Sequence, residues 1–96
     1  MAANFRILIH RNSDNVHLKL MGDFDGKSAH EVLHELKKNC HFASKVFIHT
    51  SCLKHIYPFG RYIFQNNLDF LYRQSFLIAF TGRNSRMLAP EGTKIC

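Results

Sequence analysis

The sequence predicts a small α/β domain, with a mixed, mostly parallel sheet of about four to five strands and helices packed on it. Short runs rich in β-branched and aromatic residues alternate with amphipathic segments. Their order along the chain is β-β-α-β-α-β, followed by a short tail. Strands that are joined through helices pair in parallel with right-handed crossovers, which defines this fold class.

The first two strands are predicted to form a hairpin. Residues 5–10 (FRILIH) have the composition of a strand, and residues 11–15 (RNSDN) have that of a turn. In residues 16–22 (VHLKLMG) the apolar side chains alternate with His17 and Lys19. This alternation indicates a half-buried strand that pairs with the first one.

The first helix is predicted to run from Ser28 to about Asn39. The letters SAHE fit a capping box, with Ser28 at the N-cap and Glu31 three residues later. At helical spacing one apolar stripe should face the sheet, and it consists of Ala29, Val32, Leu33, Leu36 and Cys40.

The next segment predicts a buried strand, a loop and a second helix. The run from Lys45 to Thr50 is continuously apolar in character, which is typical of a strand buried on both faces. Ser51 to Gly60 is predicted to be a loop. Pro58 suits the first turn of a helix, which we expect from Phe59 to about Leu71.

The remaining elements are short. Phe76 to Thr81 (FLIAFT) predicts another buried strand, which Gly82 closes. Residues 84–88 (NSRML) are expected to form a helical turn that ends before Pro90. Residues 93–96 (TKIC) are expected to add a short edge strand.

Length and composition predict one globular domain that spans residues 1–96. The chain is 46% hydrophobic with only 2 prolines, so it is not a disordered tail. No apolar run has the length of a membrane span and the N-terminus does not resemble a signal peptide, so we expect a cytoplasmic protein. Cys40, Cys52 and Cys96 have neither disulfide-framework nor metal-clip spacing, which favours free thiols.

The net charge of +6 can attract nucleic acid, an anionic membrane or an acidic protein. The basic residues are scattered from Arg6 to Lys94, and the only adjacent pair is Lys37 and Lys38. No nucleic-acid motif is present, so we expect no nucleic-acid partner and interpret most of these charges as solvated faces.

Residues 30–34 (HEVLH) match the zinc-protease signature His-Glu-x-x-His. The extended motif requires a histidine where Cys40 stands, and His41 is one residue out of register. His30 and His34 are expected on the water-facing flank of the helix, where they favour adventitious metal binding over catalysis. A zinc-dependent hydrolase built on His30, Glu31 and His34 remains a remote alternative. Otherwise we predict no catalytic residue, no metal and no cofactor.

Two further groups of residues carry weaker signals. Asp23 and Asp25 could form a carboxylate pair, although an aspartate before Gly26 is more typical of capping. Cys52 has His49 and His55 three residues away on either side, and a thiolate–imidazole pair is conceivable. A plain loop cysteine is the favoured interpretation.

Three segments resemble the STAS domain, the fold of anti-sigma-factor antagonists and of the cytoplasmic tails of sulfate transporters. Residues 18–36 are similar to the family's strand, turn and amphipathic helix, and Gly22, Phe24 and Asp25 match. Residues 45–60 are similar to its buried strand, connecting loop and helix start, where the matching positions are Val46, Ser51, Ile56 and Gly60. Residues 76–82 are similar to the next strand and its glycine, so the resemblance covers residues 5–88.

The chain departs from the family at its regulatory site. The family's helix begins with an aspartate and a phosphorylatable serine, but these positions hold Tyr57 and Pro58. His49 stands where the buried strand usually ends in aspartate. The resemblance implies a bacterial type of regulatory or transport-associated module that is not switched by phosphorylation at Pro58. It implies a protein partner such as a kinase-like ATPase domain or a sigma-pathway regulator.

The candidate partner-binding surface surrounds the start of the second helix. It consists of Tyr57, Pro58, Phe59, Arg61 and Tyr62 together with Asp25. Tyrosine and arginine are favoured interface residues. Two alternatives stay open: Phe59 and Ile63 could simply pack the helix onto the sheet, or the helix start with Arg61 could sense a nucleotide or another anion. A homodimer formed through the edge strand is also conceivable.

Overall fold

The computed structural model describes residues 4–39, 44–68 and 77–89 of the chain. The first half contains a strand hairpin and a long helix, and the second half contains two strands and two shorter helices. In chain order these elements are β1 (Arg6–Arg11), β2 (Asn15–Phe24), α1 (Gly26–Asn39), β3 (Lys45–Ile56), α2 (Pro58–Asn66), β4 (Leu77–Thr81) and α4 (Ser85–Leu88).

The four strands form one mixed sheet in the order β1-β2-β3-β4. β1 pairs with β2 antiparallel, whereas β2–β3 and β3–β4 are parallel. The predicted hairpin and the predicted parallel crossovers are therefore confirmed, and so is the α/β class. The expected strand over residues 93–96 lies outside the described residues, as do Cys40, His41 and Cys96.

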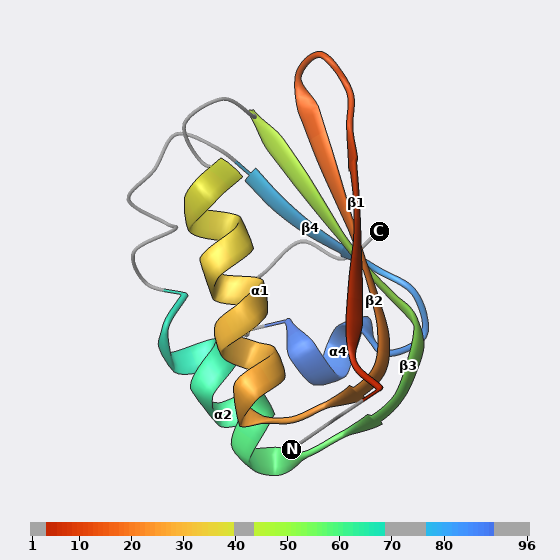
Figure 1. Cartoon of the computed structure of the whole chain (residues 1–96), viewed down its shortest axis with the longest axis vertical. Coiled ribbons are helices and arrows are strands. Elements are labelled where there is room, and N and C mark those ends of the chain that lie inside the picture. Colours follow the sequence, from red (N-terminus) through yellow and green to blue (C-terminus); the bar gives the residue numbers. More distant parts are fainter. Residues whose placement is uncertain (1–3, 40–43, 69–76, 90–96) are drawn as a thin grey trace.

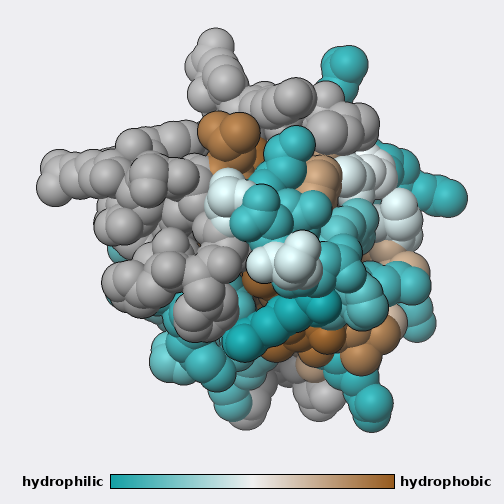
Figure 2. Space-filling model, turned by 90° about the horizontal axis from the view of Figure 1, so that it is seen from above, coloured by the Kyte–Doolittle hydropathy of each residue, from teal (hydrophilic) through white to brown (hydrophobic). Residues whose placement is uncertain are grey.

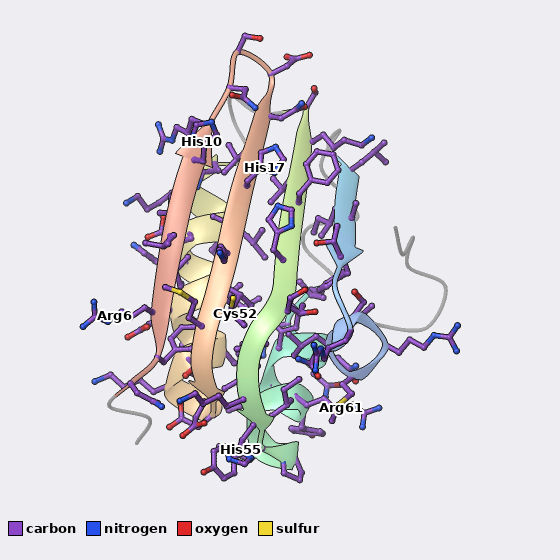
Figure 3. All side chains as sticks on the ribbon, turned by 90° about the vertical axis from the view of Figure 1, so that its right-hand side faces the viewer. Arg6, His10, His17, Cys52, His55 and Arg61 are labelled. Carbon is purple, nitrogen blue, oxygen red and sulfur yellow. The ribbon has the colours of Figure 1, made fainter. Side chains whose placement is uncertain are left out.

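The described helices cover only one face of the sheet. Figure 1 shows α1, α2 and α4 on the same side of the strands, and Figure 3 looks at the sheet from the other side. Along β3, Val46, Ile48 and Thr50 are buried, while Lys45, Phe47 and His49 are half-buried. The prediction that residues 45–50 are buried on both faces is wrong, because the strand alternates between a helix-covered face and an open one.

The burial of strand β4 is uneven and does not alternate strictly. Ala79 and Phe80 are buried, but the side chain of Leu77 is 64% exposed. The prediction of a fully buried strand over residues 76–81 is therefore wrong for Leu77, and Phe76 lies outside the described residues. Seen from the end that carries the β1–β2 turn, the described surface is mainly hydrophilic, and hydrophobic residues show only in separate places (Figure 2).

The first helix begins earlier than predicted. α1 starts at Gly26, and the Asp25 carboxylate accepts hydrogen bonds from the Ser28 N–H and the Ser28 hydroxyl, both at 2.9 Å. Asp25 is therefore the N-cap, as its place before Gly26 indicated. The capping box with Ser28 at the N-cap and Glu31 three residues later is wrong, because Asp25, three residues before Ser28, caps the helix instead.

The segment predicted as a loop over Ser51 to Gly60 is largely strand. β3 continues to Ile56 because β2 pairs with it as far as Phe24, through two register shifts. α2 begins at Pro58 and ends at Asn66, where the Asn67 N–H bonds to the Phe64 carbonyl. The predicted helix does not continue through Asn67 and Leu68, and its expected end at Leu71 lies outside the described residues. The predicted turn at residues 84–88 is confirmed as α4.

A chain of aromatic side chains connects the sheet to α2. Phe5, Phe24, Phe64 and Phe80 contact one another in sequence, edge to face, with centroid distances of 5.9, 5.7 and 6.1 Å. Phe64 is completely buried and touches both Phe24 and Phe80. The predicted stripe on α1 also packs here, since Ala29, Val32, Leu33 and Leu36 are buried.

None of the described helices combines the length and the hydrophobicity that a membrane crossing requires.

Two phenylalanines of α2 allow a matched test of this core. Phe64→Ala should lower the free energy of unfolding by about 3–5 kcal/mol, because it opens a cavity between two buried rings. Phe59→Ala removes the same atoms from a side chain that is 66% exposed, and it should cost less than about 1 kcal/mol. Urea denaturation of both variants measures the difference, and equal losses would contradict this description of the core.

Candidate functional site

The N-termini of α1 and α2 lie together at one edge of the sheet. β2 leads into α1 and β3 leads into α2, and because these strands are parallel both helices begin at the same edge. The Tyr57 N–H donates a hydrogen bond to the Phe24 carbonyl at 2.9 Å, so the two strand ends are tied directly to each other. The candidate partner-binding residues are therefore brought together as predicted, next to Asp25.

Two glycines permit the close approach of these helix starts. A Cβ atom on Gly60 would lie 2.6 Å from the backbone carbonyl carbon and oxygen of Asp25. A Cβ atom on Gly26 would lie 3.0 Å from the Phe59 ring, which can move. Gly60 therefore holds the first turn of α2 against the N-cap of α1 in a way that no larger residue allows.

Aromatic side chains project from this place into solvent. Tyr57, Phe59 and Tyr62 are 47%, 66% and 64% exposed. Arg61 is also exposed, while Ile63 packs against the core. The alternative in which Phe59 and Ile63 both pack α2 onto the sheet therefore holds for Ile63 and fails for Phe59.

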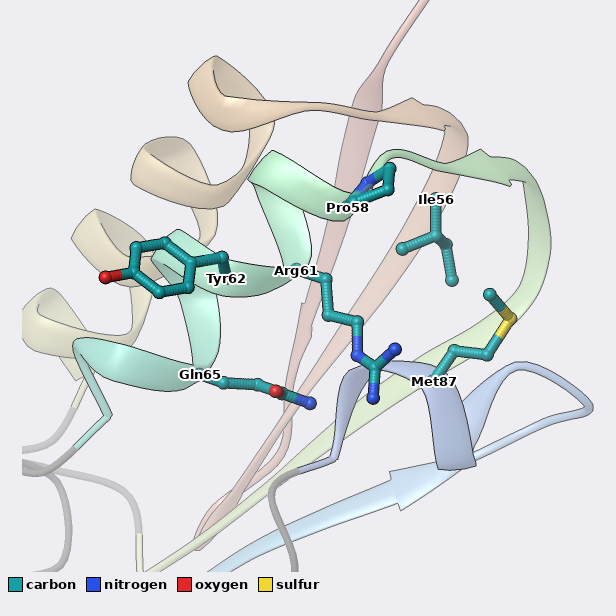
Figure 4. A pocket seen from close by; sticks show the side chains of 6 residues that line it. All are labelled: Ile56, Pro58, Arg61, Tyr62, Gln65 and Met87. Carbon is teal, nitrogen blue, oxygen red and sulfur yellow. The ribbon is translucent and has the colours of Figure 1, made fainter.

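A hollow of about 330 Å³ lies beside these side chains, between α2 and α4. Figure 4 shows Arg61 extending from α2 toward α4 and Met87, whereas the ring of Tyr62 points away. Gln65 donates hydrogen bonds to the Leu88 and Ala89 carbonyls at 3.3 and 3.4 Å, and these bonds hold α4 against α2. Met87, which is 44% exposed, was not identified from the sequence, because only the packing of α4 places it here.

The HEVLH segment lies on the exposed side of α1. His30 and His34 are exposed, as predicted from the helical spacing. They border a groove between α1 and β1 that Glu31 also lines. Within the described part of the chain, no group of three or more His, Cys, Asp or Glu side chains is arranged to hold a metal ion.

His49 has partners that the sequence did not indicate. One of its ring nitrogens, Nε2, lies 2.9 Å from Nδ1 of His17, and the other, Nδ1, lies 2.6 Å from the Thr81 hydroxyl. Both nitrogens of His49 are thus engaged away from Cys52, which is exposed. The conceivable thiolate–imidazole pair of Cys52 and His49 is therefore not formed.

The environment of His49 disfavours its charged form. Burial lowers the pKa of His49 below its ordinary value, and the positive charges of His17 and Lys19 lower this pKa further. His49 consequently stays neutral to a lower pH than an exposed histidine does.

The fold was then compared with known proteins. No family model matches the sequence, and no curated protein matches it. Solved structures do: the unphosphorylated anti-sigma factor antagonist SpoIIAA has a TM-score of 0.70 at 10% identity, with 96% of this chain and 86% of SpoIIAA covered. An uncharacterized protein from Shewanella loihica PV-4 with a SpoIIAA-like fold has a TM-score of 0.60 at 16% identity, over 100% of this chain and 90% of that one.

A third similar structure is that of Mglu, with a TM-score of 0.67 at 20% identity. The match covers 90% of this chain but only 20% of Mglu, so the same fold there accounts for a small part of a larger chain. Together these similarities show that the chain has a STAS-like fold, as the three sequence segments predicted.

The close approach at Gly60 predicts that an alanine here changes the free energy of unfolding in the direction opposite to the usual one. Replacing glycine by alanine within a helix normally stabilises it by up to about 1 kcal/mol. Gly60→Ala should instead destabilise the protein by about 1–3 kcal/mol, because the new methyl group overlaps the Asp25 backbone. Urea denaturation measures both this variant and Gly26→Ala, whose added methyl group meets only side-chain atoms, those of Phe59 and Ile63. A Gly60→Ala protein as stable as wild type would refute the packing described here.

The lowered pKa of His49 predicts a pH dependence of stability. In the unfolded chain this histidine takes up a proton below about pH 6.5, whereas in the folded chain it does so only at lower pH. The contribution of neutral His49 to the stability of the fold is therefore fully present above about pH 6.5, and it is lost as the pH falls through the pKa of His49 in the folded state.

His49→Gln should remove this part of the acid sensitivity. We would measure urea midpoints from pH 8 to pH 5, with His30→Gln on the exposed side of α1 as the control. The dependence of the urea midpoint on pH should become weaker only in His49→Gln. An unchanged slope in that variant would show that His49 is not the group responsible.

Proposed function

We propose that this chain is a non-catalytic protein-interaction module that binds a protein partner at the N-terminus of α2, in a regulatory or transport-associated complex. The observation that carries the proposal is the exposure of Tyr57, Phe59 and Tyr62 around Arg61 at one helix start. Large exposed aromatic side chains beside an arginine have the composition of an interface centre. The similarity to SpoIIAA supports a regulatory role.

The partner is proposed to be a protein such as a kinase-like ATPase domain or a sigma-pathway regulator, met in the cytoplasm. Pro58 stands at the first position of α2 and has no hydroxyl group, so binding here is not controlled by phosphorylation of that position. The interaction is therefore constitutive at this site. Sensing of an anion at the same helix start stays an untested prediction.

The shape of the surface supports docking of a protein side chain. The hollow between α2 and α4 is bordered by Ile56 and Met87 on one side and by Arg61 on the other (Figure 4). An apolar side chain of the partner can enter this space while Arg61 pairs with a neighbouring carboxylate. Asp25 contributes indirectly, because its carboxylate caps α1 and its backbone positions Gly60.

Capture from a native lysate tests the proposal. The untagged chain would be immobilised as wild type and as Tyr57→Ala/Arg61→Ala, and the bound proteins would be identified by mass spectrometry. If these side chains are interface anchors, the double variant should bind the partner at least about 30-fold more weakly, as measured with the purified partner.

Leu8→Ala/Arg6→Ala is the matched control, because it removes one exposed apolar side chain and one arginine from β1. It should capture the same partner as wild type. A partner whose affinity is unchanged by Tyr57→Ala/Arg61→Ala would overturn the assignment of this surface.

A further inference from the structure

The upper part of the open sheet face gathers side chains that are far apart in the sequence. His17 is the cross-strand neighbour of His10 on β1 and of Phe47 on β3. Lys19 is the neighbour of His49, which in turn is the neighbour of Thr81 on β4. Directly paired residues project from the same face of a sheet, so all of these side chains point away from the helices. Figure 3 looks onto this face and shows His10 and His17 near its upper end.

Three of these side chains form a cluster of nearly parallel rings, which consists of His17, Phe47 and His49. The two imidazole planes differ by 3°, and they are joined by the nitrogen–nitrogen contact of 2.9 Å. Because the N–H bonds and lone pairs of imidazole lie in the ring plane, such rings lie edge to edge and present their faces in the same direction. The Phe47 ring stacks on the His17 ring, with centroids 4.7 Å apart and planes inclined by 15°, and its plane is inclined by 14° to that of His49.

The ring cluster is held in place and remains accessible. Its three members are half-buried, and the Thr81 hydroxyl fixes the far side of His49 at 2.6 Å. The described helices all pack on the opposite face of the sheet (Figure 1). The ring orientation is therefore organised before any ligand arrives.

Positive charge surrounds the ring cluster. The Lys45 ammonium group lies 5.2 Å from the centroid of Phe47, and Lys19 is close enough to His49 to affect its protonation. His10, the cross-strand partner of His17, adds a donor from β1 and is exposed.

The aspartates of the described strands and their turn lie toward opposite ends of β2. Asp14 lies in the β1–β2 turn, where its carbonyl accepts a hydrogen bond from Ser44, and Asp23 lies toward the other end of β2. The surface next to the rings thus combines aromatic area with the cations Lys19 and Lys45.

We propose that this open face, centred on His17, Phe47 and His49 and flanked by Lys19 and Lys45, binds single-stranded nucleic acid. Unpaired bases stack on flat aromatic rings, and lysine ammonium groups pair with the phosphates between the bases. Lys45 can exchange its contact with the Phe47 ring for a phosphate when a base takes its place. A double-stranded duplex keeps its bases stacked on one another and cannot use the rings in this way.

Other occupants fit less well. A second copy of the chain would bring the same cations face to face, which is repulsive. An acidic polypeptide would satisfy Lys19 and Lys45 but has no use for three parallel rings. The expectation of no nucleic-acid partner rested on the scattering of basic residues along the sequence. The strand register gathers Arg6, Lys19 and Lys45 on one face.

Fluorescence anisotropy with the full untagged chain tests this proposal. The probe is a fluorescein-labelled 12-nucleotide oligothymidylate, and binding is expected with a Kd of about 1–100 µM at low salt. Phe47→Leu keeps the charge and most of the apolar volume but removes the ring, and it should weaken binding about 5- to 150-fold. Lys19→Ala/Lys45→Ala should weaken binding and lower the salt slope by about two.

Lys37→Ala/Lys38→Ala is the matched control, because it removes two lysines from the last turn of α1. It should leave the affinity for the oligonucleotide almost unchanged. Tyr57→Ala/Arg61→Ala should also bind the oligonucleotide like wild type, which separates this face from the α2 surface. Circular dichroism and urea denaturation confirm that each variant is folded.

A base-free sugar-phosphate 12-mer and polyglutamate serve as competitors that carry charge without bases. Both should compete at least about tenfold less well than unlabelled oligothymidylate. Absence of binding, equal loss in the two lysine pairs, or equal competition by either competitor would overturn the proposal. Equal competition by polyglutamate would assign the face to an acidic protein segment instead.

Discussion

The described helices cover one face of the sheet, and the rest of the structure depends on this constraint. Each strand must alternate, because only every second side chain can reach the core. In β3, Val46 and Ile48 are fully buried, while Phe47 and His49 between them face the open side. The same segment of sequence therefore supplies core residues to one face and chemically varied residues to the other.

The same constraint brings the starts of α1 and α2 together. Both helices lie on one face and begin at the same sheet edge, so their first turns are forced into close contact. The conflict is resolved by Gly60, which lets the backbone of α2 contact that of Asp25. The larger side chains of this turn, Tyr57 and Phe59, are consequently directed outward, so the exposed aromatic surface is a consequence of the helix packing.

The sequence could predict features that depend on local periodicity, but it could not predict those that depend on strand register. The hairpin and the apolar stripe of α1 follow from spacings within short segments, and the structure confirms them. The extension of β3 through Cys52 to Ile56 depends on its pairing with β2, whose register shifts leave no local signal. For the same reason His17 and His49, which are distant along the chain, were not recognised as a pair.

Pro58 fits the first turn of α2 and leaves that position without a hydroxyl group. Proline at the first position of α2 lacks an N–H that would have had no helical partner anyway, so it fits the helix without cost to hydrogen bonding. The neighbouring side chains Tyr57, Phe59 and Tyr62 face solvent and supply aromatic contact area at the helix start. This surface lies near the lower end of the molecule in Figure 3, around Arg61, while His10 and His17 lie near the upper end. The proposed partner site at α2 and the proposed ligand site on the open sheet face are therefore separate places on the molecule.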